Sequence, residues 1–424
     1  MVHYYYRTQQ IIVRKSNPDY KFLDNLCFKA KELYNLALYT ERQIYFGQID
    51  PNTKGKFLHY FNLYKMFDTE TIIKEHTSSF ISEVLKQVYQ DCKSFQAATR
   101  AYNKHPERFK GRPKLPHYKH KTNGRCIVNF GKGQLGSRNP GYITLPNKYQ
   151  SFKVKIPRHI NQEDIQCLRI VPQNQRIVLE IVYSKPIEEP DTTNLKYTAG
   201  VDLGVDNFAT IAVYGPNKTP LILNGKGLKS YNKYFNKRLS YLQSQAMTCN
   251  GLHTTARIQR LYNKHQNYIN TWMHTASKRT VEYLVQNQVG YLVIGINEGW
   301  KQNSTLSKVV NQTFIQIPYQ KFIDQLTYKA KEQGIKVYHT EESYTSGTSF
   351  LDNEAPTKEN YNKSRRIHRG LFKSNEGYLI NADVNAAYQI IKKVVPSALY
   401  TIEGYGIVGC NTHPVKQTIE TQRV

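Results

Sequence analysis

One stretch, residues 199–210, constrains the fold of this chain more than any other. Its sequence, A-G-V-D-L-G-V-D-N-F-A-T, predicts a strand that reaches Asp202, a corner marked by Gly and Asn, and a second strand over 208–214. A carboxylate within a buried strand is costly unless a cation or a metal ion compensates its charge. Asp206 is different, because an Asp-Asn dipeptide is typical of a turn. Asp202 is therefore the first candidate for a functional carboxylate.

Two further carboxylates follow at the ends of predicted elements. The apolar strand predicted over 289–295 is followed by Glu298, and a helix predicted to open near residue 381 carries Asp383 in its first turn, where the helix dipole favours negative charge. Three carboxylates suit a pair of divalent ions about 3.5–4 Å apart, which hydrolyse phosphodiester bonds. We expect Asp202, Glu298 and Asp383 to be both catalytic residues and metal ligands. Mg²⁺ is the expected ion, with Mn²⁺ as an alternative.

Short motifs accompany these carboxylates in a fixed order. They are G-V-D-L-G-V at 200–205, V-I-G-I-N-E at 293–298, Y-K-A-K-E-Q-G-I-K-V at 328–337, Y-T-S at 344–346 and N-A-D-V-N-A-A at 381–387. Together they resemble the TnpB (OrfB) family of transposon-encoded RNA-guided DNA endonucleases, which are relatives of the type V CRISPR effectors. The similarity extends from about residue 100 to 395. It implies a Mg-dependent enzyme, encoded by or derived from an insertion sequence, that cuts guide-matched double-stranded DNA beside a short flanking motif.

The patterns along the chain, with this resemblance, predict an α/β multidomain protein. Apolar residues recur at helical spacing over 19–48, 56–67 and 78–103, and short strands separated by Gly, Pro and Asn corners follow from residue 126 to 185. The expected domains are a wedge domain's first part (1–18), a helical recognition lobe (19–108), the wedge β-barrel (109–190), an RNase H-like (RuvC) nuclease domain with helical and 340–380 target-loading inserts (191–395), and a C-terminal tail (396–424).

The charge of the chain indicates a polyanionic partner. Lys and Arg number 59 against 32 Asp and Glu, which gives a formal net charge of +27. A ribosome-associated or membrane-surface protein could show the same balance. No apolar run approaches the roughly 18 residues needed to span a bilayer, and the N-terminus lacks a signal-peptide core. We therefore expect no membrane partner and a cytoplasmic, nucleoid-associated protein.

The segment 104–125 is the first candidate for contact with nucleic acid. Glu107 is the only acidic residue among its many Lys and Arg residues, and its prolines exclude a long helix. Charge runs are usually solvated surface, but cations interleaved with aromatic rings suit phosphate contact and base stacking. Two predicted basic helices, 230–245 and 256–286, and a basic loop near residue 367 are further candidates. The predicted nucleic-acid-binding residues are Lys104, Arg108, Lys110, Arg112, Lys114, Lys119, Lys121, Lys237, Arg238, Arg257, Arg260, Arg365, Arg366 and Arg369.

The chain departs from the family in one respect. Many members carry two Cys-x-x-Cys pairs between the Thr-Ser motif and the last Asp, whereas no cysteine lies between Ser346 and Asp383 here. We therefore expect no zinc, and the chain resembles a variant without the four-cysteine motif. Arg365, Arg366 and Arg369 occupy this region instead. They suit contact with the cleaved strand, and a solvated basic loop is an equally good interpretation.

Three functional classes fit these observations to different degrees. A guide-directed DNA-binding repressor or transposition regulator would need no metal-binding acids. A strand-transferring transposase of the DDE type usually ends its set on Glu, whereas this chain ends on Asp383. A guided, metal-dependent endonuclease fits best. The resemblance implies as partners a guide RNA from the transposon end or a CRISPR-like locus, double-stranded target DNA with a flanking motif, and one protein monomer per guide RNA.

Overall fold

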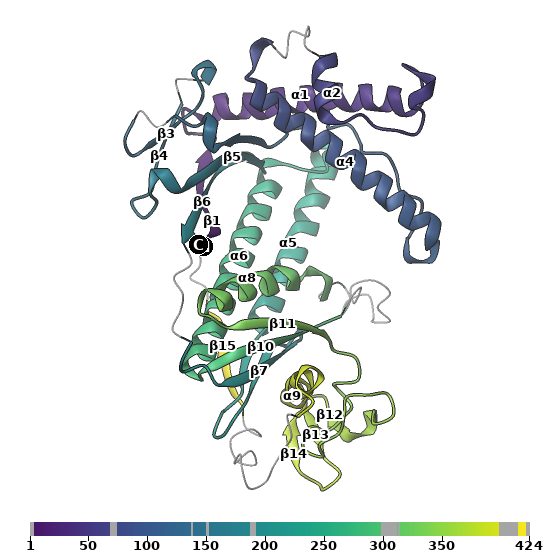
Figure 1. The fold of residues 1–424 in the computed structure, drawn as a ribbon, viewed down its shortest axis with the longest axis vertical. Coiled ribbons are helices and arrows are strands. Elements are labelled where there is room, and N and C mark those ends of the chain that lie inside the picture. The colour runs from purple at the N-terminus through teal and green to yellow at the C-terminus, as the bar shows by residue number, and fades with distance from the viewer. Residues whose placement is uncertain are drawn as a thin grey trace. The chain divides into compact units, whose positions relative to one another are not determined.

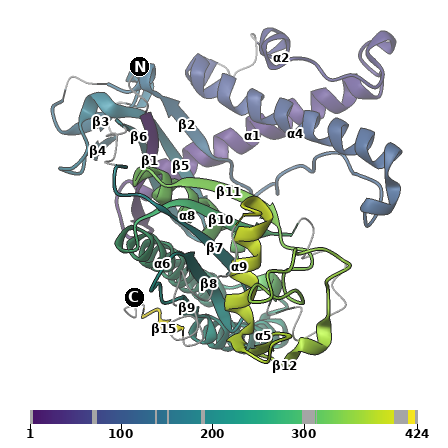
Figure 2. The ribbon, with the colours of Figure 1, turned by 60° about the horizontal axis from the view of Figure 1, so that its bottom comes forward.

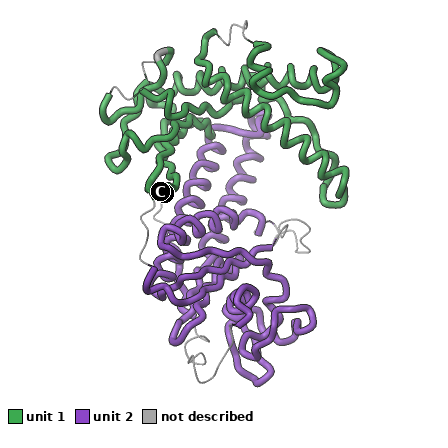
Figure 3. The backbone as a smooth tube through the Cα atoms, viewed as in Figure 1, with its two compact units in different colours: residues 1–187 green, residues 188–424 purple. Residues whose placement is uncertain are grey.

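The computed structural model of the chain shows helices and sheets in two compact units (Figures 1 and 3). The units comprise residues 1–187 and 188–424. The structure describes residues 4–67, 74–136, 139–149, 152–186, 192–297, 312, 314–397 and 414–420. Within these ranges, no helix is both long and apolar enough to cross a membrane.

Within the described residues, the first unit contains the α-helices α1 (Tyr20–Tyr45), α2 (Tyr60–Met66) and α4 (Ser78–Lys104). The Thr77 hydroxyl caps α4 by accepting a hydrogen bond from the Phe80 backbone NH at 3.4 Å. The apolar faces of α1 and α4 contribute Leu23, Leu33 and Phe80 to one buried cluster. These helices confirm the helical periodicity read from the sequence.

The strands of the first unit form a four-stranded antiparallel sheet and a separate ribbon. The sheet has the order β1-β6-β5-β2, with β1 (Tyr4–Arg14), β6 (Arg176–Pro186), β5 (Ile165–Gln173) and β2 (Val128–Gly131). The ribbon pairs β3 (Tyr142–Thr144) with β4 (Lys153–Lys155). Because β1 pairs with β6 from Tyr4↔Pro186 to Arg14↔Arg176, the sheet joins the first strand of the chain to strands that follow the helices.

Short 3-10 helices connect the larger elements. They are η1 (Pro51–Thr53), η2 (Pro106–Arg108), η3 (Lys132–Gln134), η4 (Asn147–Tyr149), η5 (Gln162–Asp164) and η6 (Lys363–Arg365).

The second unit is built on a six-stranded sheet of order β11-β10-β7-β8-β9-β15. β7, β8 and β9 are antiparallel neighbours, β10 and β11 continue parallel to β7, and β15 lies parallel to β9. The strands are β7 (Tyr197–Leu203), β8 (Asn207–Tyr214), β9 (Leu221–Asn224), β10 (Val289–Ile296), β11 (Lys336–Glu341) and β15 (Val415–Thr418). A small three-stranded sheet contains β12 (Arg366–His368), β13 (Leu371–Lys373) and β14 (Leu379–Asn381).

Helices cover both faces of the large sheet. They are α5 (Lys226–Asn250), α6 (Ala256–Gln286), α8 (Tyr319–Glu332) and α9 (Ala382–Val394). Successive side chains of a strand point to opposite faces. On one face, Val201 belongs to the cluster that contains Trp272 of α6 and Phe322 of α8. On the other face, Ala212 of β8 belongs to the cluster of α9, which crosses the strands in Figure 2.

Two glycines bring α9 close to the sheet. A Cβ on Gly200 would lie 2.1 Å from the carbonyl oxygen of Ala387, so the backbone of α9 approaches β7 directly at this point. A Cβ on Gly295 of β10 would lie 2.6 Å from Ile390 Cδ1 and 2.9 Å from an oxygen of Glu342. At Gly200 the close atom belongs to the backbone, so only a residue without a side chain leaves room there, whereas at Gly295 a larger residue would require the side chains of Ile390 and Glu342 to move.

A short strand lies within the C-terminal tail expected over 396–424, of which the structure describes residues 396–397 and 414–420. Residues 415–418 form β15, which pairs with β9 from Val415↔Leu221 to Thr418↔Asn224. All four side chains of β15 are exposed, and Ile419 beyond them is buried. Backbone hydrogen bonds to β9 therefore hold the strand. Because its side chains are exposed, its sequence shows no alternating apolar pattern that would predict a strand.

Replacing Gly200 by Ala should destabilise the unit of residues 188–424, because the new Cβ would meet a backbone atom of α9. Overpacking of this kind costs about 1–3 kcal/mol. We expect the midpoint of thermal unfolding of this unit, measured by calorimetry, to fall by about 2–10 °C. Gly227→Ala is the matched control, because a Cβ there meets nothing within 4 Å and Ala favours the helix. Equal midpoints for the two variants would contradict the prediction.

Candidate functional site

Asp202 lies near the carboxyl end of β7. Its strand alternates so that Asp202 shares the face of Gly200, the face that α9 covers. Burial raises the pKa of Asp202 well above its ordinary value, and the negative charges of Glu342 and Asp383 raise it further. The guanidinium of Arg366 opposes this shift. Three carboxylates from distant parts of the sequence thus act on one another here.

Asp383 occupies the first turn of α9. The side chain of Asn381 caps the helix by accepting hydrogen bonds from the backbone NH groups of Asp383 at 3.0 Å and Val384 at 3.2 Å. One carboxylate oxygen of Asp383 accepts a hydrogen bond from Asn207 Nδ2 at 2.7 Å, and the other pairs with the guanidinium of Arg366 at 2.9 Å. Both carboxylate oxygens of Asp383 are therefore engaged, one by Asn207 and the other by Arg366.

Glu342 is the carboxylate that the sequence reasoning did not single out. It follows β11 directly, and burial raises its pKa to about 7, with the charge of Lys393 opposing the shift. Its Oε1 accepts a hydrogen bond from Asn297 Nδ2 at 2.7 Å. Its Oε2 is buried and accepts no hydrogen bond from the described residues. Parallel strand pairing could have pointed to Glu342, because β11, β10 and β7 are parallel and end at the same edge of the sheet.

Glu298, the third acid expected from the sequence, lies outside the described residues. The residue before it, Asn297, follows β10 and contacts Glu342. The structure therefore brings Asp202 and Asp383 to one site and adds Glu342 to them.

The chemistry of this site suits a hard divalent cation. Carboxylate oxygens are the ligands such ions prefer, and a buried oxygen of Glu342 without a donor is costly unless a cation or proton compensates it. Among the described residues, no group of three or more Asp, Glu, His or Cys side chains is arranged to hold a metal ion as it stands. Asp383 is instead engaged by Arg366 and Asn207, which is consistent with the absence of such a group among the described residues.

The segment 363–373 carries the basic residues expected beside the site. Arg366 pairs with Asp383, and Arg369, whose side chain is 82% exposed, pairs with Asp206 at 3.0 Å. Lys229 pairs with the same Asp206 at 2.8 Å and, with Arg369, lowers the pKa of that carboxyl. Two arginines of one short segment therefore neutralise two acids of the second unit.

Arg365 is used differently from its neighbours. Its guanidinium lies 2.6 Å from Glu354 and 3.8 Å from Asp352, and its side chain is only 15% exposed. The guanidinium of Arg365 is therefore engaged by two carboxylates within the fold, and its contact with nucleic acid stays a prediction.

The basic segment 104–125 is anchored along α1. Lys31 Nζ donates to the carbonyl of Lys121 at 2.7 Å, Asn35 Nδ2 donates to that of Lys119 at 2.9 Å, and Arg42 donates to that of Pro116. These bonds hold the backbone in an extended course and leave its cations facing solvent. The exposed cations are Lys104, Arg108, Lys110, Arg112, Lys114, Lys119 and Lys121.

The basic residues predicted on the helical pair lie on α5 and α6. Lys237, Arg257 and Arg260 are exposed, and Arg238 is half-buried, with its guanidinium over the ring of Tyr241 at 5.3 Å. The opposite faces of these helices pack together through Leu242, Ala246 and Ile258.

Comparisons with known proteins show what parts of the chain are similar to. The model of the OrfB_IS605 family, described as a probable transposase, matches residues 177–301, and the Cas12f1-like TNB domain matches residues 319–390. The TnpB-like protein ORF457 of Acidianus two-tailed virus is 25% identical over 205 residues, which are 46% of this chain and 42% of that protein. The chain therefore matches less than half the length of this relative.

A solved structure shares the fold. Cas12f1 in its complex with sgRNA and target DNA superposes with a TM-score of 0.55 at 14% identity, covering 87% of this chain and 82% of that one. At this identity the likeness concerns the fold alone. The matches together define an α/β multidomain protein of the OrfB and Cas12f1 kind. These matches are of the kind that the TnpB-like motifs predicted, and they cover residues 177–301 and 319–390 of the chain.

Divalent ions should stabilise the second unit through Glu342. Because its folded pKa of about 7 exceeds the ordinary 4.5, the folded protein holds a proton that the unfolded chain releases. Without metal, this contribution to stability is complete below about pH 4.5 and is lost as the pH rises through about 7. We expect Mg²⁺ or Mn²⁺ to raise the unfolding midpoint more at pH 8 than at pH 6. At 100 times the dissociation constant the gain is about 2.7 kcal/mol.

Glu342→Gln and Asp202→Asn should each remove most of this response. Glu341→Gln is the matched control, because Glu341 is the neighbouring acid and is exposed. Scanning calorimetry with and without the ion measures the shift. A response that survives in Glu342→Gln would remove this residue from the metal site.

Binding of duplex nucleic acid should depend on the basic segment. If Lys110, Arg112 and Lys114 contact phosphates, changing all three to Gln should lower the slope of log affinity against log salt by about 0.9 per lost contact. Lys15, Lys21 and Lys65, equally exposed in the same unit, form the matched control triple. Titrations over a salt series supply the slopes, and an unchanged slope in the first triple variant would exclude the segment from the binding surface.

Proposed function

We propose that this protein is an RNA-guided, Mg-dependent endonuclease that cuts double-stranded DNA matching its guide. The observation that carries the proposal is the set of Asp202, Glu342 and Asp383 at one edge of the sheet, where burial and mutual repulsion raise the pKa of Asp202. Such a set has little structural value by itself, because each charge destabilises the others. It fits a site built for divalent ions.

The topology of the second unit supports an RNase H-like (RuvC) assignment. Three antiparallel strands, β7 to β9, are followed by β10 and β11, which lie parallel to β7. This order puts an acid on the first strand, an acid after the last parallel strand and an acid on the following helix, α9, next to one another. We assign the wedge domain to the strands of the first unit and the recognition lobe to α1, α2 and α4.

The residues of the site have distinct proposed roles. Asp202, Glu342 and Asp383 would hold Mg²⁺, or Mn²⁺ in its place, and Glu298 is proposed as a further ligand from its position after β10. The bound ions would supply Lewis acidity toward phosphate and a water with a lowered pKa. Asn297 and Asn207 orient Glu342 and Asp383 through their hydrogen bonds. If Asp383 turns to a cation, Arg366 loses its acceptor and can pair with a phosphate oxygen.

Guidance by RNA accounts for how target sequence would be chosen. The described residues form helices, small sheets and exposed basic surface, which suit gripping a duplex through its backbone and shape. The solved Cas12f1 that shares this fold is bound to sgRNA and target DNA. We propose the same classes of partner here: one guide RNA per protein monomer, and DNA that carries a short flanking motif. One set of acids would cut the two strands in succession.

The test is cleavage of plasmids that match or do not match the guide, using protein purified with its co-expressed RNA. We expect cutting of the matched plasmid with its flanking motif in Mg²⁺ and no cutting in chelator. Asp202→Ala and Glu342→Gln should each lower the rate by at least about 100-fold, since removing one stabilising group commonly costs that much.

Glu341→Gln, with the neighbouring exposed acid changed, should cut at the rate of the unaltered protein. Equal cutting of matched and scrambled plasmids, or cutting by RNA-free protein, would indicate an unguided nuclease. Tight guided binding without cutting would indicate a DNA-binding repressor.

A further inference from the structure

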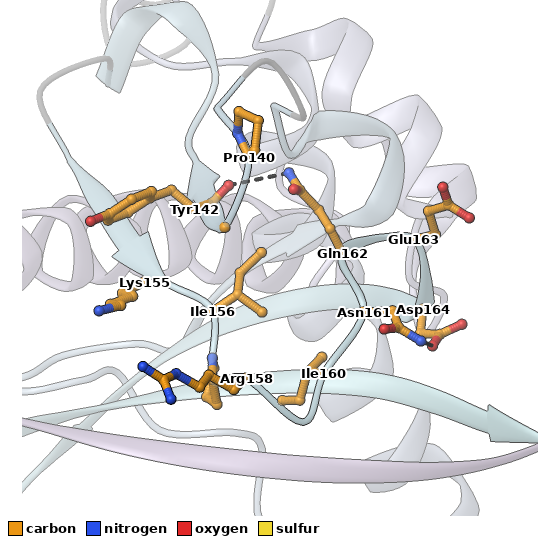
Figure 4. Close-up of a pocket in the computed structure, with 12 residues that line it drawn as sticks. Pro140, Tyr142, Lys155, Ile156, Arg158, Ile160, Asn161, Gln162, Glu163 and Asp164 are labelled. Atoms are coloured by element: carbon orange, nitrogen blue, oxygen red, sulfur yellow. Dashed lines mark hydrogen bonds between the residues drawn. The ribbon is translucent and has the colours of Figure 1, made fainter.

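A hollow of about 750 Å³ opens in the first unit beside the ribbon of β3 and β4 (Figure 4). Its floor contains Ile156 and Ile160, which are 7% and 6% exposed and belong to the core. Tyr142, Lys155 and Arg158 line one side, and residues 161–164 line the other. The volume is within the range of small-molecule sites, about 300–1,000 Å³.

The outer face of the ribbon presents an aromatic ring with cations around it. Ile143 and Val154 point inward and are buried, whereas Tyr142, Lys153 and Lys155 point outward. Tyr142 and Lys155 are direct partners across the two strands, so their side chains are neighbours on one face. Figure 4 shows both extending to the same side of the hollow. The Tyr142 side chain is 40% exposed, although a tyrosine ring favours burial.

Lys155 and Arg158 make no ion pair among the described residues, and the carboxylates of Glu163 and Asp164 lie on the opposite side of the hollow. Arg158 lies in a turn closed by a hydrogen bond from the Ile160 NH to the Pro157 carbonyl at 3.0 Å. An exposed ring beside two free cations is the combination that binds a base and its phosphate.

The opposite side of the hollow is held in place. Gln162 Nε2 donates to the backbone carbonyl of Tyr142 at 3.2 Å, the bond drawn in Figure 4. Asn161 Nδ2 donates to Asp164 at 3.1 Å, and Lys132 donates to the carbonyl of Glu163 at 2.6 Å. These bonds fix two side-chain amides beside the hollow. Amides both donate and accept hydrogen bonds, as the edge of a nucleobase requires.

We propose that this hollow binds one unpaired nucleotide of the nucleic acid that the protein carries or engages. The base stacks on the ring of Tyr142, the phosphate lies between Lys155 and Arg158, and the edge of the base faces Asn161 and Gln162. Stacking tolerates every base, so the site selects an unpaired nucleotide rather than a sequence. The inference rests on the proposed function only in taking nucleic acid as the partner, and it does not require cleavage.

Photocrosslinking to the full-length protein tests the position of the base. The probes are single-stranded oligo-U RNA and oligo-dT DNA of about 10 nucleotides, each with one 5-iodouracil base. Trypsin should release residues 139–148 as a peptide in which Tyr142 is the only aromatic residue. We expect the crosslinked base on this peptide, and its loss in Tyr142→Leu. A crosslink from RNA only, from DNA only or from both identifies the nucleic acid that the site takes, and no crosslink from either probe would overturn the proposal.

Affinity measurements test the roles of the ring and the cation. Tyr142→Leu should weaken binding of the crosslinking probe by about 5- to 100-fold without changing the salt slope, whereas Tyr142→Phe keeps the ring and the affinity. Arg158→Gln should lower the slope by about 0.7. Tyr291→Leu is the matched control, because Tyr291 is 42% exposed and faces Lys336 across two strands of the second unit.

Equal affinity of Tyr142→Leu and Tyr291→Leu would overturn the stacking role, and an unchanged slope in Arg158→Gln would overturn the phosphate contact. Neither assay uses cleavage. An inactive nuclease that still crosslinks through residues 139–148 would therefore refute the proposed function and leave this site in place.

Discussion

The close approach of α9 to β7 is the constraint on which the rest of the second unit depends. At Gly200 the strand has no side chain, and the backbone of α9 lies where a Cβ would otherwise be. This contact places the first turn of the helix, and Asp383 with it, near Asp202, two residues further along the strand. Gly295 on the adjacent strand leaves room for Ile390 and for the carboxylate of Glu342. Two absent side chains therefore allow three carboxylates to meet.

Bringing these carboxylates together is unfavourable, and the surrounding residues reduce the cost. Burial raises the pKa values of Asp202 and Glu342, and their negative charges oppose one another. Arg366 and Asn207 engage Asp383, and Asn297 engages one oxygen of Glu342. The other oxygen of Glu342 has no donor among the described residues. A fold tolerates such an arrangement at a functional site, where the missing charge arrives with a ligand.

The first unit uses its charge in the opposite way. Most cations of the segment anchored to α1, and Lys155 and Arg158 beside Tyr142, are exposed to solvent, whereas Arg125 at the end of the segment pairs with Asp24 at 2.8 Å. Holding the backbone through Lys31, Asn35 and Arg42 leaves the side chains of the segment free to contact phosphates. Nucleic acid supplies negative charge along its whole length, so a surface of fixed backbone and free cations suits it. The two units thus suit the binding and the chemistry of the proposed nuclease.

The sequence by itself determined the elements and two of the three acids of the described site. The periodicity over 256–286 predicts α6, and the A-G-V-D-L-G-V stretch identifies Asp202, because these signals arise between residues close in the chain. The motif at 328–337 ends before Glu342, whereas the strand β11 extends to Glu341. Pairing between β10 and β11 defines this strand, and that pairing joins residues far apart in sequence, such as Tyr291 and Lys336.

Only the tertiary structure decided which charges meet. Arg366 and Arg365 are adjacent in a basic loop, yet one reaches Asp383 and the other is enclosed by Glu354 and Asp352. β15 joins the sheet mainly through backbone hydrogen bonds, which every residue except proline can donate. Local patterns record which face of an element is buried, because burial repeats with the period of the element. They do not record the partner across a sheet edge or an ion pair, because that partner is set by how the elements pack.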